Sequence, residues 1–248
     1  MNLLLFEQNE LSGTCLELDG KDRRARHIVD ILGLQTGDTM RVGMVNGKIG
    51  SGRILYAEKQ GVKMDVTLST MPHECRDITL VLALPRPIML QRILKQATVM
   101  GVRRFHLIRS ARVQKSYFQS TSLQEEAVRN VLLQGLEQAM DTRMPEVLIH
   151  NRFRPFVEDV VPEMKQESRL LAHPDASLTL PGLYDQGLVD NKFVLAIGPE
   201  GGWNDFEVQS FRDQGFACFS FGSRILHVDT AVLVLLSQLM VLQDLRNR

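Results

Sequence analysis

The 248-residue sequence is poor in cysteine, carries no excess charge of either sign, and lacks an apolar run long enough to span a bilayer. Its three cysteines, Cys15, Cys75 and Cys218, are odd in number and lack metal or redox spacing, which indicates reduced thiols and a cytoplasmic location. The N-terminal apolar run has no basic segment before it and is too short for a signal peptide. With 29 basic and 29 acidic residues and 44% hydrophobic content, the chain has the composition of a soluble globular protein.

Metal ligands and familiar phosphate-binding motifs are also missing. No Lys-Ser or Lys-Thr follows the glycine-rich stretches, which excludes a P-loop, and there is no G-x-G-x-x-G dinucleotide fingerprint. The histidines other than His227 show no ligand spacing, so we expect no metal. These are His27, His73, His106, His150 and His173.

Two strand–loop–helix units near the C-terminus carry the strongest pattern. Phe193–Ile197 is an apolar run that ends in Gly198-Pro199-Glu200-Gly201-Gly202, and Phe216–Phe221 is a second run that ends in Gly222-Ser223-Arg224. Asn204 and Glu207 have the spacing of a helix cap with its reciprocal partner. Both loops should lie at the carboxyl edge of one sheet, where open α/β sheets bind ligands. A tight turn with a helix cap, without a ligand, gives the same pattern.

The first 70 residues have a different pattern. Short apolar runs at 39–45, 53–57 and 62–68 are separated by turn signals, including Gly50-Ser51-Gly52, which predicts a small antiparallel β-barrel. A basic cluster, Lys21–His27, opens a short helix that continues to Leu32, and it is either a solvated helix start or a phosphate contact. Met71-Pro72-His73 is the expected linker, giving domains at 1–72 and 73–248.

From Ile78 onward, strands and helices alternate. Strands are predicted at the apolar runs 78–84, 105–108, 147–149 and 170–172. Pro87 begins a helix that Gly101 ends, Thr121 or Ser122 caps a long helix reaching Met140, and residues 155–164 form another helix. This alternation predicts an α/β fold with a doubly wound, mostly parallel sheet and helices on both faces.

The segment between Asp77 and Glu125 contains no acidic residue. A neutral protein that segregates cations in this way presents a positive face to a polyanion, unless acidic side chains from elsewhere in the fold neutralise them. Tyr117 and Phe118 add aromatic rings on which unstacked bases could lie. The eight cations are Arg86, Arg92, Lys95, Arg103, Arg104, Arg109, Arg112 and Lys115.

The two C-terminal motifs, IGPEGGWNDFEV and FGSRILHVDTAV, resemble the signature of RsmE-type ribosomal RNA (uracil-N3) methyltransferases of the SPOUT superfamily. These proteins typically read IGPEGGF…E followed by LG-x-RILR-x-ETA, and the resemblance extends over nearly the whole chain. It implies a trefoil-knotted methyltransferase domain that binds S-adenosylmethionine in its knot loops, an N-terminal PUA-like RNA-binding barrel, and a homodimer. The apolar helix that begins near Asp229 is expected to serve as its interface.

The resemblance implies roles for three groups of residues. Arg224, His227 and Asp229 are catalytic candidates. Cofactor contacts are expected from Ala172, His173, Ile197, Gly198, Glu200, Gly201, Gly202, Phe219, Phe221, Gly222, Ile225, Leu226 and Thr230. Contacts to ribosomal RNA, free or in the small subunit, are expected from Arg23, Arg24, Arg26, Arg86, Arg92, Lys95, Arg112 and Lys115.

Several of these residues also have simpler explanations. Glu200 could accept local N–H groups, Arg224 could bond to neighbouring carbonyls, and His227 could bond to backbone at a helix start. Trp203 is expected to be a packing anchor rather than a stacking platform.

The chain departs from the family pattern at four polar positions. Gln96 and Val99 stand where the family has lysine and glutamate, Asp141 where it has arginine, and His227 where it has a second arginine. Asp229 replaces the family glutamate but keeps its charge. The cofactor motif is nearly intact, so these changes predict a preserved donor site beside an altered acceptor site.

Overall fold

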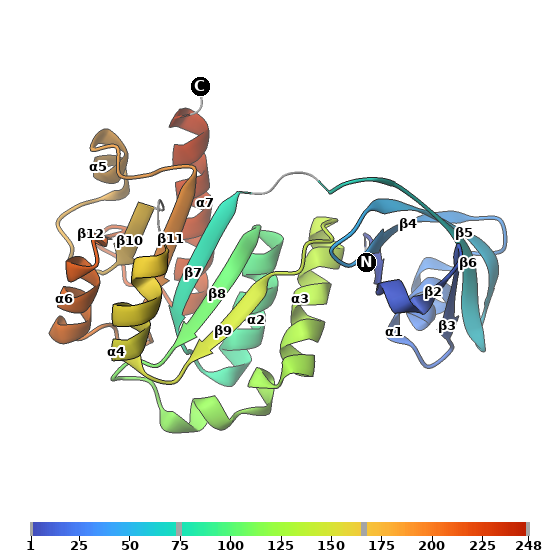
Figure 1. The fold of residues 1–248 in the computed structure, drawn as a ribbon, viewed down its shortest axis with the longest axis horizontal. Coiled ribbons are helices and arrows are strands. Elements are labelled where there is room, and N and C mark those ends of the chain that lie inside the picture. The colour runs from blue at the N-terminus through green and yellow to red at the C-terminus, as the bar shows by residue number, and fades with distance from the viewer. Residues whose placement is uncertain (1, 73–75, 165–167, 247–248) are drawn as a thin grey trace. The chain divides into compact units, whose positions relative to one another are not determined.

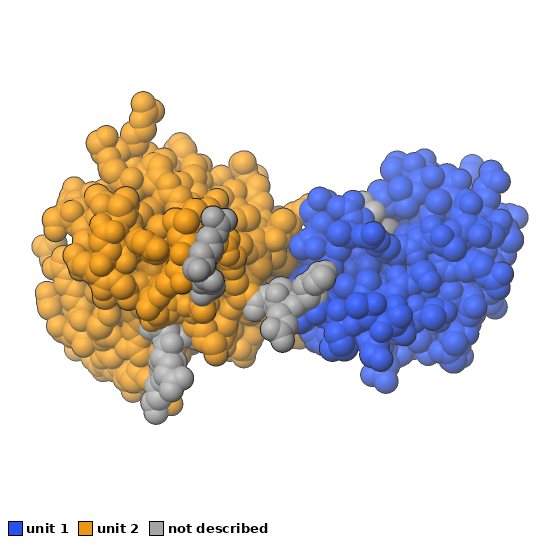
Figure 2. Space-filling model, turned by 90° about the horizontal axis from the view of Figure 1, so that it is seen from above, with its two compact units in different colours: residues 1–74, 132–144 blue, residues 75–131, 145–248 orange. Residues whose placement is uncertain are grey.

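A computed structural model describes residues 2–72, 76–164 and 168–246 and shows two compact units (Figure 2). Unit 1 contains residues 1–74 and 132–144, and unit 2 contains residues 75–131 and 145–248. Segment 132–144 joins unit 1 although it lies far along the chain, which the sequence pattern did not indicate. His73 of the expected linker and Cys75 lie outside the described residues.

Unit 1 is built on a six-stranded sheet in the order β1-β4-β5-β6-β3-β2, curled into a half-barrel (Figure 1). β1 pairs with β4 in parallel, so the expectation of a wholly antiparallel barrel was wrong at this edge. The reason is the connection: β2, β3 and the helical segment lie between β1 and β4, and parallel strands require such a crossover. The strands are β1 (Leu4–Phe6), β2 (Leu11–Ser12), β3 (Cys15–Asp19), β4 (Thr39–Met44), β5 (Ile49–Glu58) and β6 (Gly61–Thr70).

Gly50 and Gly52 were expected in a turn but lie inside β5. A Cβ on Gly50 would lie 1.9 Å from the carbonyl oxygen of Thr67 in β6. A Cβ on Gly52 would lie 2.7 Å from the sulfur of Met64, which is fully buried in the core. The glycines are therefore needed for close packing within the sheet.

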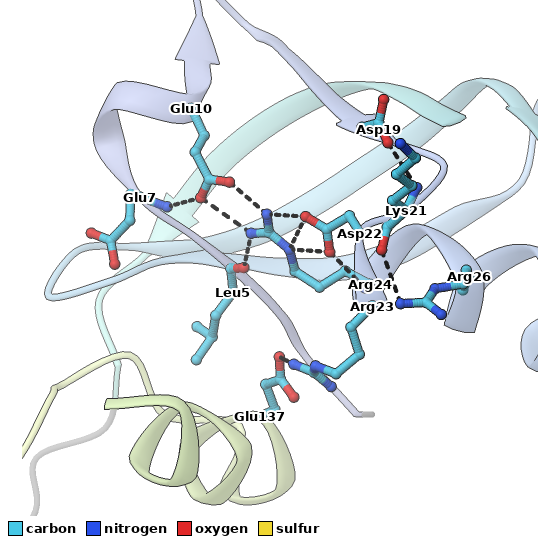
Figure 3. A network of polar contacts seen from close by, with 10 residues as sticks. All are labelled: Leu5, Glu7, Glu10, Asp19, Lys21, Asp22, Arg23, Arg24, Arg26 and Glu137. Carbon is cyan, nitrogen blue, oxygen red and sulfur yellow. Dashed lines mark hydrogen bonds and ion pairs between the residues drawn. The ribbon is translucent and has the colours of Figure 1, made fainter. Parts of the chain in front are cut away.

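The basic cluster forms α1 (Arg23–Arg26) and a π-helical turn (His27–Leu32), as predicted. Figure 3 shows that the Arg24 guanidinium points inward to Glu10 and Asp22, 2.5 and 2.7 Å away, and donates to the Leu5 carbonyl at 2.9 Å. Burial opposes charge on Arg24, but these carboxylates outweigh it and raise the pKa of Arg24. Arg23 pairs with buried Glu137 at 2.6 Å within the same unit.

Unit 2 contains a six-stranded sheet in the order β12-β10-β11-β7-β8-β9, with every pair parallel. The predicted α/β fold with a mostly parallel sheet is confirmed. α2 and α7 pack together behind the sheet, and α4 and α6 lie on its other face, where Phe153 meets Phe211 edge-on (Figure 1). The strands are β7 (Asp77–Ala83), β8 (Val102–Ile108), β9 (Glu146–His150), β10 (Ser168–Ala172), β11 (Lys192–Ile197) and β12 (Ala217–Phe219).

The helix ends follow local sequence in most places. Pro87 is the first residue of α2, and Asn204 and Glu207 form the predicted capping box at α6, each side chain accepting from the other's backbone. The cap predicted at Thr121 or Ser122 was wrong, because residues 121–123 form a separate 3-10 turn capped by Ser120. The helices are α2 (Pro87–Val99), α3 (Glu125–Ala139), α4 (Phe153–Pro155, continued by π and 3-10 turns to Glu163), α5 (Leu180–Asp185), α6 (Asp205–Asp213) and α7 (Val228–Arg246).

The C-terminal helix α7 extends further than the apolar run suggested. It covers 19 residues and is long and apolar enough to cross a membrane by length and composition. The expectation that the chain has no apolar segment of that length was therefore wrong. The apolar run ends at Leu242, but the helix continues to Arg246. The core helix of a soluble protein passes the same test. Val232, Leu236 and Leu239 are fully buried in unit 2.

Candidate functional site

A cavity of about 670 Å³ lies at the carboxyl ends of β10, β11 and β12. The glycine loops after β11 and β12 both contribute to its wall, as does the first turn of α2, which follows β7. Parallel strands bring these loops to one edge of the sheet, which is why segments far apart in the sequence meet there. The volume is within the range of small-molecule and cofactor sites.

Most residues predicted to contact the cofactor line this cavity. The loop after β10 contributes as well as the two glycine loops. Gly201 and Thr230 do not appear in its lining. The predicted residues that line it are Ala172, His173, Ile197, Gly198, Glu200, Gly202, Phe219, Phe221, Gly222, Ile225 and Leu226.

In the loop after β11, Gly202 and Gly198 are each required for a different structural reason. Gly202 has φ of 72° and donates its N–H to the Pro199 carbonyl at 2.8 Å, which closes a tight turn. Gly198 has no side chain because a Cβ there would lie 3.1 Å from the indole nitrogen of Trp203. We call residues 198–202 the donor loop. In the loop after β12, Gly222 has φ of 140°. Both loops therefore depend on conformations or approaches that a side chain would disturb.

Trp203 is a buried packing anchor, as expected, and it also lines the cavity. Its ring meets Phe211 of α6 edge-on, with centroids 5.3 Å apart. The indole N–H has no hydrogen-bond partner among the described residues. The indole therefore forms part of the support behind the donor loop.

Glu200 has the local contact that the simpler explanation required. Its Oε1 accepts the backbone N–H of Arg86 at 3.3 Å, joining the donor loop to the segment after β7. Both residues are exposed and both line the cavity. The carboxylate therefore lies at the mouth of the cavity.

The three catalytic candidates have different positions. Arg224 and His227 are exposed and line the cavity. Asp229 is buried in the first turn of α7 and pairs with Arg92 of α2, with 3.4 Å between Nη1 and Oδ2. It is not part of the cavity lining. The Asp229 carboxylate therefore joins the first turn of α7 to α2.

Acidic side chains from elsewhere in the fold pair with some of the eight cations between Asp77 and Glu125. Asp77 lies 3.0 Å from Arg104, and Asp229 pairs with Arg92. The expectation of eight uncompensated cations was therefore wrong for these two, because β7 and α7 bring carboxylates alongside. Arg86, Lys95, Arg112 and Lys115 remain exposed.

The positions that depart from the family pattern lie in several parts of the fold. Gln96 on α2 has a buried side-chain oxygen without a hydrogen-bond partner among the described residues, and Val99 is 38% exposed. Asp141 accepts the N–H groups of Thr142 and Arg143 and so caps a turn in unit 1. His227 is the departure that lines the cavity.

Several lining residues were missed by the sequence reasoning. Val228, Ala231 and Leu235 follow one face of α7 at helical spacing, and this periodicity could have identified them. Ile88 and Met89 come from α2, and no local pattern indicated that α2 begins beside the donor loop. The others missed are Pro174, Pro199 and Trp203, each adjacent to a predicted residue.

No group of three or more His, Cys, Asp or Glu side chains is placed to hold a metal ion within the described parts of the chain. One pair of histidines joins β8 to the edge strand β9, with His106 buried and His150 half-buried. His106 of β8 and His150 of β9 have ring nitrogens 2.9 Å apart. Desolvation, helped by His150 and Arg104, lowers the pKa of His106 to about 4.

Comparisons with known proteins agree with this architecture. The model of the RNA methyltransferase domain family matches residues 72–240. The ribosomal RNA small subunit methyltransferase E of Treponema pallidum is 32% identical over 232 residues, covering 93% of this chain and 87% of the relative. The methyltransferase E 1 of Borreliella burgdorferi is 24% identical and covers 94% of both chains.

Solved structures share the fold. The methyltransferase E of Neisseria gonorrhoeae, bound to S-adenosylmethionine, superposes with a TM-score of 0.77 at 19% identity, covering 97% of this chain and 98% of the other. A putative methyltransferase of Legionella pneumophila, also with S-adenosylmethionine bound, gives 0.79 at 22% identity, covering 97% of each chain. With the family match and the Treponema relative, these findings show that the chain belongs to the RNA methyltransferase family and, within it, to the small subunit methyltransferase E (RsmE) group.

Proposed function

We propose that this protein transfers a methyl group from S-adenosylmethionine to ribosomal RNA, with N3 of a uridine in 16S ribosomal RNA as the default acceptor. The observation that carries the proposal is the cavity between the two glycine loops, at the edge where β10, β11 and β12 end. The relatives' names and the donor bound in the Neisseria and Legionella structures support it.

The residues of the cavity fit such a donor. Aromatic and aliphatic side chains, including Phe219, Phe221 and Leu226, supply surface for a base and a hydrocarbon chain. The donor loop supplies backbone groups at a position where a Cβ would collide with Trp203. The predicted contacts, including Gly201 and Thr230 outside the lining, would hold the donor from the loops after β10, β11 and β12.

The donor supplies an activated methyl group, so the protein must align the acceptor and manage one proton. Uracil N3 carries its proton at neutral pH, and methylation requires its removal or stabilisation of the developing anion. Arg224 is exposed at the cavity, and its guanidinium would stabilise negative charge on the base. His227 lines the same wall, and we assign it to proton handling. Asp229 would act through α7, without touching the base.

RNA would contact the exposed cations of both units. In unit 2 these are Arg86, Lys95, Arg112 and Lys115. In unit 1 we retain Arg23 and Arg26, which are exposed, but not Arg24, which is enclosed by Glu10 and Asp22. We infer from family membership that unit 1 is PUA-like and that residues 73–248 form a trefoil-knotted domain.

We also infer a cytoplasmic homodimer with α7 and neighbouring segments in its interface. Val241 and Leu245 on α7 are 55% and 46% exposed, and Ile88 at the start of α2 is 78% exposed. Val241 and Leu245 lie one helical turn apart on one face of α7, and exposed apolar side chains on one helix face favour a protein interface over contact with water. Light scattering on the purified chain tests this, and a monomer would contradict it.

Two other functions fit parts of the site. His227, the altered position that lines the cavity, would suit a different acceptor, either another RNA base or a ribose hydroxyl. Loss of catalysis would leave an RNA- or ribosome-binding protein. Mass spectrometry of 16S ribosomal RNA from cells lacking the protein decides among them: loss of 3-methyluridine supports the proposal, and loss of another modification supports the first alternative. An unchanged RNA with no donor binding by calorimetry supports the second.

A further inference from the structure

The basic loop that follows β8 makes two separate contacts, one with the donor loop itself and one with the start of α6, directly after the donor loop. We call residues 109–115 the basic loop, because it contains Arg109, Arg112 and Lys115. Ser110 to Val113 forms a turn closed by a hydrogen bond of 3.1 Å. None of residues 109–115 lines the cavity. Any effect of a bound donor on this loop must therefore pass through the contacts between the loops.

The first contact is made by Glu207, whose side chain is buried with 2% of the residue exposed. Its Oε1 accepts the N–H of Ala111 at 2.7 Å, and its Oε2 accepts the N–H of Asn204 at 3.0 Å. A capping box alone requires only the second of these bonds. The other oxygen reaches across to the basic loop, so one carboxylate ties that loop to the start of α6, directly after the donor loop.

The second contact is made by Arg112. Its guanidinium donates to the carbonyl of Gly201 in the donor loop. The side chain lies so close that a Cβ on Gly201 would be 3.1 Å from Cδ of Arg112. A side chain at position 201 would therefore have to displace Arg112 slightly, although this position does not line the cavity. Arg112 is otherwise exposed, and a guanidinium with five N–H donors can bind phosphate while keeping this bond.

We propose that Glu207 is a positioning residue that makes the donor loop and the basic loop move as one body, so that an occupied donor site orders the RNA-contacting residues. This inference rests on the proposed function, since it requires a methyl donor in the cavity and RNA on the basic loop. The ordering of one loop lowers the entropy lost when the second ligand binds, which makes donor and RNA binding mutually favourable.

The test is amide hydrogen exchange on the full chain, with and without S-adenosylhomocysteine as the probe. In the wild type, the ligand should slow exchange both in the donor loop and, roughly threefold or more, in residues 109–115. In Glu207→Gln, whose side-chain amide cannot accept both N–H groups, protection should persist in the donor loop and weaken in 109–115, where the bond from Arg112 to Gly201 remains. The matched control is Asn204→Ala, which breaks the same capping box but leaves the Ala111 bond in place.

Kinetics supply the second readout. Because the coupling is reciprocal, Glu207→Gln should raise the KM for RNA, and the KM for the donor at saturating RNA, by a similar factor of about fivefold or more. Donor affinity without RNA should stay nearly unchanged. Asn204→Ala should change none of these quantities, although both variants lose thermal stability. If the ligand does not slow exchange in residues 109–115 of the wild type, or slows it equally in Glu207→Gln, the proposal is wrong while the proposed function stands. A ligand that protects neither the donor loop nor residues 222–226 overturns both.

Discussion

Arg24 of α1 in unit 1 and the arginines at the carboxyl edge of the sheet in unit 2 have opposite surroundings. Arg24 is enclosed by two carboxylates and a carbonyl, and its side chain is 16% exposed. Arg86 and Arg224 line a cavity, and neither forms an ion pair with a described residue. A buried charge must be paired within the fold, whereas an exposed one is available to a ligand. The comparison therefore separates arginines that hold the fold from those that serve the site.

The variant expected to have the largest effect on this comparison is Arg24→Met. Removal of the guanidinium leaves Glu10 and Asp22 without their partner, and we expect a loss of about 2–4 kcal/mol in the free energy of unfolding of unit 1. Urea unfolding of the full chain measures it. Affinity of unit 2 for S-adenosylhomocysteine should stay within twofold under native conditions. A variant as stable as the wild type would show that the network in Figure 3 does not hold the half-barrel.

Arg224→Ala tests the other side of the comparison. We expect the rate of methyl transfer to fall about 100-fold, since a preorganised donor to a developing anion is worth roughly this much. The free energy of unfolding should change by about 0.5 kcal/mol or less, because the side chain is exposed. Arg224→Lys is the control for charge alone and should recover part of the rate. Full activity in Arg224→Ala would remove this residue from the mechanism.

The histidine pair of β8 and β9 extends the comparison to a group that is kept uncharged, because His106 is buried. His106 has a pKa of about 4 in the folded chain, below the ordinary value near 6.5. As pH falls from 6.5 towards 4, the unfolded chain binds a proton that the folded chain does not, so stability decreases by about 3 kcal/mol at most. Stability measured against pH should have a shallower slope in His106→Gln than in the wild type. Equal slopes would mean that the pair does not titrate as inferred.

The smallest expected effect is on the salt dependence of RNA binding. Lys115→Gln should lower RNA affinity uniformly and reduce the slope of log K against log salt by about one, if the lysine contacts one phosphate. The matched control is Lys63→Gln in unit 1, where the lysine already lies 3.6 Å from Glu17. Filter binding at several salt concentrations measures both. Equal slopes for wild type and Lys115→Gln would place RNA elsewhere.

Local sequence was sufficient wherever one short segment decides the structure. Pro87 at the start of α2, the Asn204–Glu207 capping box and the apolar run of β11 formed as predicted. In each, the interacting groups are within a few residues of one another, so their pattern is visible in the chain. The glycine loops of the site belong to this class.

Features that depend on distant segments could not be predicted. Gly50 and Gly52 have the composition of a turn, and only the approach of β6 and Met64 explains them. The pairing of Asp229 with Arg92 depends on how α7 crosses α2, which sequence periodicity does not specify. The same holds for the return of segment 132–144 to unit 1. Tertiary packing, not local preference, determined each of these.

Trp203 is the single tryptophan of the sequence, and its indole lies in the cavity wall behind Gly198. All of the indole emission of the protein therefore originates at the place where a small molecule would bind. The native chain is thus its own optical sensor, and a titration followed by fluorescence needs neither label nor engineered probe.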